Sequence, residues 1–187
     1  MTSQTSSNIS SQLLQSIQAK LARGAIGASS MRGAGSKGVV EAVRTSLAKV
    51  SLNDFGTADA SAFRDALDAA TEDIVQGLPK QARHWGLARK GLNIFLRDCL
   101  YTVYLREPFS LHRGERLFEV PLDSITGKRL YEESGGRLPR WASVRGLNMN
   151  LSDRFQAEAS GLADKRRIAR VHLDAIWWGE RLDESKG

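Results

Sequence analysis

Two residues of this chain combine a reactive side chain with a position at the start of a predicted helix. Lys90 lies in segment 85–96 and Asp123 in segment 118–125, and an apolar pattern with helical spacing follows each of them. A neutral lysine amine is a nucleophile, and a fixed carboxylate stabilises the positive charge that develops on a sugar as its base leaves. The two side chains together could therefore break a glycosidic bond.

The apolar pattern around Lys90 predicts a long helix over residues 87–105 that is covered on two sides. One side carries a regular apolar stripe formed by Ala88, Leu92, Phe95, Leu96, Cys99 and Val103. Lys90 lies about half a turn away from this stripe. The second side is mixed, with Asn93, Ile94, Arg97 and Tyr101. We therefore expect Lys90 to face a cleft, and the alternative is a solvated surface lysine.

The turn before this helix has the composition of a phosphate site. Gly86 permits a close approach of the backbone to a ligand. The first amides of the following helix have no partner within the helix and favour an anion. Three cations surround the turn, namely Lys80, Arg83 and Arg89. We expect Gly86 and these cations to contact a nucleic-acid backbone.

Asp123 has a structural interpretation beside the chemical one. It follows Pro121 and Leu122 and precedes a predicted helix, which is the position of an N-cap that accepts backbone N–H bonds. A capping carboxylate is rigid, and the positive helix terminus keeps it ionised. A cap and a catalytic group are therefore compatible roles for this one side chain.

Apolar periodicity predicts an all-α fold, and no segment has a convincing strand pattern. The predicted helices cover 12–23, 37–51, 58–76, 78–83, 87–105, 123–133, 152–164 and 165–181. The main predicted loops are 24–38, 53–59, 107–116 and 135–150. Segment 1–11 is polar and predicted to be a disordered tail, and residues 12–187 are predicted to form a single helical domain.

Composition limits the classes of protein that need to be considered. The net charge of +6 suits a polyanionic partner. The lone Cys99 forms no disulfide within the chain, and the three histidines lack metal-ligand spacing, so we expect neither a metal nor another cofactor. The sequence shows no membrane span and no secretory signal. We expect a cytoplasmic protein that acts as a monomer.

Segment 86–94, Gly-Leu-Ala-Arg-Lys-Gly-Leu-Asn-Ile, resembles the Gly-Val-Gly-Arg-Lys-Thr-Ala-Asn hairpin of endonuclease III-type enzymes, which are helix-hairpin-helix DNA glycosylases. Lys90 falls on the catalytic lysine of that family. Segment 120–124, Val-Pro-Leu-Asp-Ser, is similar to the stretch that bears its catalytic aspartate. The long interval between the two looks like the archaeal 8-oxoguanine glycosylase branch. The resemblance covers about residues 78–178 and implies a two-lobed helical bundle, a hairpin at about 78–105 and a central cleft.

The same branch carries an aspartate and a tryptophan one turn apart on its last helix, where they line the base pocket. Asp174 and Trp178 have this spacing. Ile94 stands where the branch has an aromatic pocket residue, and the smaller side chain leaves room for a bulkier base. Trp141 is a further candidate for stacking on an exposed base. Core packing is the alternative for Trp141 and for the Trp177-Trp178 pair.

These features predict a DNA glycosylase that flips a modified base out of double-stranded DNA, with Lys90 attacking C1′ and Asp123 assisting. The expected substrate is oxidised guanine, in repair, or a bulky hypermodified base of phage DNA, in antiviral defence. Cleavage of the strand by a lyase step is open. The alternative is a non-catalytic helix-hairpin-helix module that only binds DNA. Whether Lys90 and Asp123 meet in space discriminates between the two.

Overall fold

The computed structural model describes residues 10–27 and 38–184, and this part of the chain is all-α. Its helices are α1 (Ser11–Ala25), α2 (Val39–Leu47), α3 (Ala60–Gly77), α4 (Trp85–Tyr101), α5 (Val103–Arg106), α6 (Ser124–Glu133), α7 (Met149–Lys165) and α8 (Leu173–Glu184). Short 3₁₀ turns lie at Leu52–Phe55, Lys80–Ala82, Leu111–Gly114, Val144–Gly146 and Arg170–His172. The described residues contain no strand, as the periodicity predicts, and no described helix has the length and hydropathy needed to cross a bilayer.

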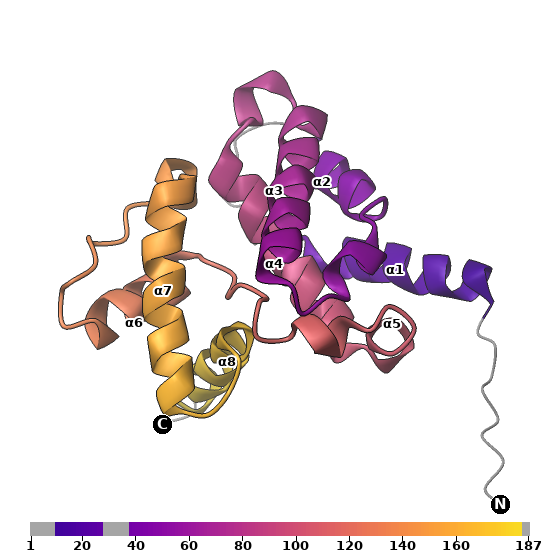
Figure 1. The fold of residues 1–187 in the computed structure, drawn as a ribbon. Coiled ribbons are helices and arrows are strands. Elements are labelled where there is room, and N and C mark those ends of the chain that lie inside the picture. The colour runs from indigo at the N-terminus through magenta and orange to yellow at the C-terminus, as the bar shows by residue number, and fades with distance from the viewer. Residues whose placement is uncertain (1–9, 28–37, 185–187) are drawn as a thin grey trace, which may run out of the picture.

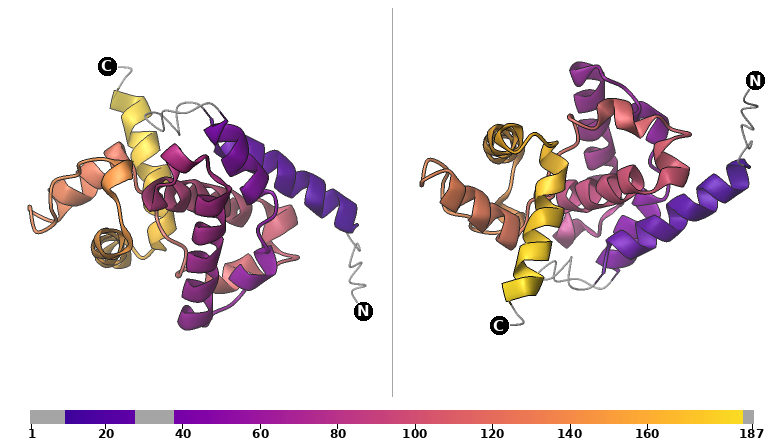
Figure 2. Two further views of the ribbon diagram at one scale, coloured as in Figure 1. Left: turned by 90° about the horizontal axis from the view of Figure 1, so that it is seen from above. Right: turned by 90° about the horizontal axis from the view of Figure 1, so that it is seen from below.

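The helices form two groups, each around its own apolar core. Helices α1–α5 surround the first core, which includes Val43, Phe63, Leu92 and Phe95. Helices α6–α8 surround the second, which includes Leu130, Phe155 and Trp177. Figure 1 shows the two groups side by side, and both views in Figure 2 show α8 lying between α6 and α7 and the first group. We call the two groups lobe 1 and lobe 2.

Helix α4 joins the two lobes because both of its sides are covered, as its mixed pattern predicts. The apolar stripe, apart from Val103, is buried in the first core. The other side bonds to residues of the second half of the chain: Lys90 to Asp123, Asn93 to Glu119, Arg97 to Asp174 and Tyr101 to His172. The functional candidates on α4 therefore lie at the boundary between the lobes.

Local capping explains where several helices begin. Asp59 accepts from the amides of Ser61 and Ala62 at the start of α3, and Asn148 accepts from the amide of Leu151 at the start of α7. Asp123 caps α6 in the same way. Short polar side chains at these positions satisfy amides that have no partner inside the helix.

The predicted boundaries are wrong in several places, and the helix predicted over 78–83 is only the 3₁₀ turn Lys80–Ala82. The helix predicted over 87–105 ends at Tyr101, because Thr102 is extended (φ −95°, ψ 107°), and Val103 is consequently 59% exposed. The helix predicted over 165–181 begins only at Leu173, and that predicted over 37–51 ends at Leu47. The predicted tail 1–11 and loop 24–38 lie mostly outside the described residues, although residue 11 begins α1.

Candidate active site

The structure brings Lys90 and Asp123 together. The Lys90 Nζ lies 3.7 Å from the Asp123 Oδ2, with 9% of the lysine side chain and 25% of the aspartate side chain exposed. Lys90 comes from the second turn of α4 in lobe 1, and Asp123 from the start of α6 in lobe 2. The amine is thus shielded by protein, whereas the carboxylate beside it remains reachable from solvent.

Asp123 divides its two oxygens between two tasks. Its Oδ1 accepts hydrogen bonds from the amides of Ile125 and Thr126, at 2.9 and 3.0 Å. Its Oδ2 is the oxygen that faces Lys90. The cap fixes the carboxyl group in one orientation, so the second oxygen is held beside the amine without a further partner having to position it.

A chain of polar contacts continues from Asp123 into lobe 2 and back to α4. Thr126, which is fully buried, donates from its hydroxyl to Asp174 Oδ1 at 3.3 Å. Asp174 Oδ2 accepts a charge-assisted hydrogen bond from Arg97 Nη1. Arg97 in turn pairs with its neighbour Asp98 at 2.8 Å. These contacts tie α4, the first turn of α6 and α8 to one another around the Lys90–Asp123 pair.

Asp174 therefore differs from the base-reading residue that the resemblance implies. It is 6% exposed, and both of its carboxyl oxygens are occupied by protein donors. Burial is the largest influence on its ionisation and raises the pKa of Asp174, and the charge of Asp123 acts in the same direction, whereas Arg97 opposes them. In this structure Asp174 positions Thr126 and Arg97 behind the pair rather than facing a ligand.

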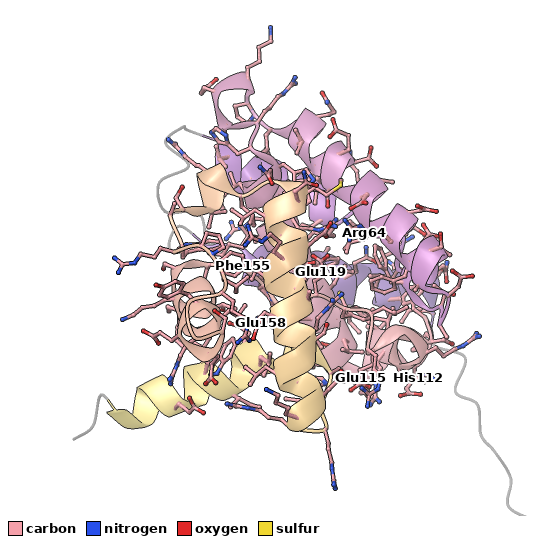
Figure 3. All side chains as sticks on the ribbon, turned by 60° about the vertical axis from the view of Figure 1, so that its left-hand side comes forward. Arg64, His112, Glu115, Glu119, Phe155 and Glu158 are labelled. Carbon is pink, nitrogen blue, oxygen red and sulfur yellow. The ribbon has the colours of Figure 1, made fainter. Side chains whose placement is uncertain are left out.

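Arg89 is not available to a DNA backbone, and that prediction is corrected. It is 1% exposed and donates to the carboxylates of Glu119 and Asp68, at 3.0 and 2.6 Å. It also donates to the hydroxyl of Thr71 at 2.7 Å, and its guanidinium lies 5.0 Å from the ring centroid of Trp85. These contacts fasten α4 to α3 and to the segment leading into α6. Figure 3 shows Glu119 close to α7.

The prediction that Gly86 contacts a nucleic-acid backbone is also corrected, because protein fills the space beside this glycine. A Cβ on Gly86 would lie 2.2 Å from the carbonyl oxygen of Val144 and 2.7 Å from the Cβ of Leu147. The glycine therefore permits the 144–147 turn to pack on the start of α4. Of the predicted cations, Lys80 is exposed. Arg83 is exposed but donates to the carbonyls of Leu78 and Gln76 at the end of α3.

The aromatic candidates separate into packed and exposed rings. Trp177 is 2% exposed in the second core, whereas Trp178 is 46% exposed, so only one of the two neighbours packs inward, as the helical spacing predicts. Trp141 is corrected to a packing residue. Its ring lies over Gly127, where an added Cβ would come within 2.4 Å, and it makes an edge contact with Phe155. Ile94 is half-buried against the first core.

Sequence reasoning missed Thr126 and Arg97 as neighbours of the Lys90–Asp123 pair, and Glu119 as the buried partner of Arg89. Arg97 lies on the same side of α4 as Lys90, which was a usable signal, whereas Thr126 and Glu119 are recognisable only once the lobes are placed. Within residues 10–27 and 38–184, no group of three or more His, Cys, Asp or Glu side chains is arranged to hold a metal ion. Comparison with protein families, with curated proteins and with solved structures finds no match for this chain.

Proposed function

We propose that this protein is a DNA glycosylase in which Lys90 is the nucleophile and Asp123 the assisting acid–base group. The observation that carries the proposal is the 3.7 Å approach of the Lys90 amine to the Asp123 carboxylate, at the boundary between the lobes. An amine for covalent attack and a carboxylate fixed by a helix start are the two groups that base excision through a Schiff base requires. Segment 78–84 between α3 and α4 would be the hairpin of a helix-hairpin-helix motif.

The proposed reaction begins with the neutral Lys90 amine attacking C1′ of a nucleotide flipped out of the duplex. The glycosidic C–N bond breaks, and the base leaves with the electron pair and takes up a proton. The attacking nitrogen, now positively charged, gives a proton to Asp123 Oδ2. Opening of the sugar ring then forms a Schiff base between Lys90 and C1′. Asp123 also stabilises the positive charge that builds up on the sugar.

The proposed partner is double-stranded DNA that carries a modified base. The net charge of +6 favours a polyanion, and Lys80 remains exposed beside the start of α4. The two candidate substrates are oxidised guanine and a bulky hypermodified base of phage DNA. Excision measured on a panel of modified oligonucleotides separates a repair enzyme from a defence enzyme.

Borohydride trapping tests the nucleophile directly. Reduction of the Schiff base should join wild-type protein to damaged DNA covalently, and Lys90→Met should abolish both the adduct and base release. Lys128→Met is the matched control, because Lys128 is 75% exposed on α6 and pairs only loosely with Glu132, at 3.8 Å. It should retain the adduct. A wild-type protein that binds DNA but gives neither adduct nor base release would instead be a non-catalytic binding module.

A further inference from the structure

A second feature lies apart from Lys90, at the far end of α4. A pocket of about 710 Å³ opens between segments 112–117 and 167–172. Figure 3 shows His112 and Glu115 at this position, beside the C-terminal end of α7. The volume is within the range of small-ligand sites. Neither Lys90 nor Asp123 lines this pocket.

The two walls of the pocket are joined by well-defined polar contacts. The Nε2 of His172 lies 2.7 Å from Glu115 Oε1, and its Nδ1 lies 2.9 Å from the Tyr101 hydroxyl. Arg170, which is next to the pocket, donates to the carbonyls of Leu117 and Phe118 at 2.9 and 3.1 Å. The pocket is therefore a fixed part of the fold rather than a gap between two loose segments.

Positive charge dominates the lining. The lining includes three arginines, Arg113, Arg116 and Arg167, and one carboxylate, Glu115, which is already engaged by His172. Arg116 pairs with Asp164 at 3.3 Å, but the two side chains are 72% and 69% exposed, and such surface pairs exchange partners at little cost. A dianionic or polyanionic group would therefore find several donors available.

The backbone at Arg167, in the wall of the pocket, has a conformation that side chains rarely adopt. Arg167 follows the end of α7 with φ 59°, and the amides of Arg167 and Ile168 bond back to the carbonyls of Asp164 and Ala163. This is the Schellman arrangement, whose left-handed position usually takes glycine because a Cβ is strained there. Among the described residues the other non-glycine with positive φ, Ser110 at 53°, begins the turn that carries Arg113.

We propose that this pocket binds a backbone phosphate of the DNA strand, away from the nucleotide that Lys90 would attack. This inference rests on the proposed function, because that function is what identifies the ligand as DNA. Lys90 and Tyr101 lie on one helix, about 16 Å apart along its axis at 1.5 Å per residue, and Tyr101 contacts His172 of the pocket wall. In an unbent duplex this distance corresponds to roughly five base pairs.

Two pocket variants and one matched control test the proposal. Arg113→Gln and Arg167→Gly each remove one positive charge from the pocket, and Arg23→Gln removes one from the exposed last turn of α1. The affinity for an unmodified duplex is measured at several salt concentrations. Each pocket variant should weaken binding about five- to tenfold near 0.1 M salt and reduce the slope of log K against log salt by about 1, whereas Arg23→Gln should do neither.

Arg167→Gly separates a ligand contact from damage to the fold. Glycine adopts the left-handed conformation without strain, so this variant should unfold at the same temperature or about 2–4 °C higher while binding DNA more weakly. Pocket variants that bind DNA like Arg23→Gln would overturn the proposal. Loss of ATP binding, measured by calorimetry, with DNA affinity intact would assign the pocket to free nucleotides and overturn it too.

The proposed function can fail independently of this inference. Wild-type excision with a Lys90 adduct, combined with unchanged DNA affinity in both pocket variants, would remove the phosphate site and leave the glycosylase. Pocket-dependent DNA binding without any adduct or base release would keep the phosphate site and remove the glycosylase. A wild-type protein with no affinity for DNA would remove both.

Discussion

The two tasks of Asp123 can be separated by two substitutions at the same position. Asp123→Asn and Asp123→Ala both remove the negative charge beside the Lys90 amine, but only asparagine keeps a side-chain oxygen for the amides of Ile125 and Thr126. Asparagine caps a helix as well as aspartate does, and alanine does not. A difference in stability between the two variants therefore reports the loss of the cap, and an effect common to both reports the loss of the charge.

The magnitudes follow from the capping geometry. Loss of an N-cap costs about 1 kcal/mol, which for a chain of this length lowers the unfolding temperature by about 2–4 °C. We expect Asp123→Ala to unfold that much below Asp123→Asn in a calorimetric scan. Base release should fall in both variants alike, by about 10²–10⁴-fold if Asp123 acts in proton transfer, when measured under single-turnover conditions on modified duplex.

Asp59 provides the matched control. Its Oδ1 accepts from the amides of Ser61 and Ala62 at 2.8 and 2.9 Å, which is nearly the geometry of Asp123, at the start of α3 in lobe 1. Asp59→Ala should lose a similar amount of stability relative to Asp59→Asn, with base release unchanged in both. Full base release in Asp123→Asn would refute the catalytic role of the charge. Equal stability of Asp123→Ala and Asp123→Asn would refute the capping argument.

Three further substitutions test the surroundings of the site. Arg89→Met leaves the buried Glu119 carboxylate without its cation and should lower the free energy of unfolding by about 3–5 kcal/mol, while duplex affinity of the folded protein stays unchanged because Arg89 is 1% exposed. Gly86→Ala places a Cβ 2.2 Å from a backbone carbonyl and should lower the free energy of unfolding by about 1–3 kcal/mol. Gly24→Ala is the control: its Cβ meets no atom within 4 Å, and it should stabilise α1 by about 0.5–1 kcal/mol. Equal effects of the two substitutions in denaturant titrations would contradict the packing at Gly86. Burial raises the pKa of Asp174, so the folded state binds the carboxyl proton more tightly than the unfolded state does. The free energy of unfolding should therefore fall as pH rises from the ordinary aspartate pKa of about 3.9 through the raised pKa. Asp174→Asn should lack this pH dependence, and an unchanged pH dependence in that variant would contradict the assignment to Asp174.

Local patterns in the sequence were sufficient for the helices but not for every boundary. The apolar stripe of α4 and the caps at Asp59 and Asp123 are signals that a single segment carries, and the structure follows them. The break at Thr102 and the left-handed turn at Arg167 have no glycine or proline to mark them. Apolar periodicity alone reports neither of them.

The same distinction explains the outcome for the site residues. Lys90 and Asp123 were recognisable as candidates because each lies at a characteristic place near the start of its own helix, whereas their meeting was left for the structure to decide. The surroundings of Gly86 and Arg89 were not predicted correctly. A glycine and an arginine beside a turn give the same sequence pattern whether they contact a phosphate or another part of the protein. Only the structure shows that the 144–147 turn fills the space beside Gly86 and that Glu119 binds the Arg89 guanidinium.

The neighbours Arg89 and Lys90 show why the chemistry is assigned to one and not the other. Arg89 is 1% exposed, and its guanidinium is saturated by short contacts with two carboxylates, a hydroxyl and a carbonyl. A cation held in this way can stabilise the joint between helices but has no room to react. Lys90 lies 3.7 Å from a carboxylate that is 25% exposed and fixed through its other oxygen. An amine beside a rigid, accessible acid can pass its proton to that acid, and this contrast between adjacent residues supports Lys90, rather than Arg89, as the proposed nucleophile.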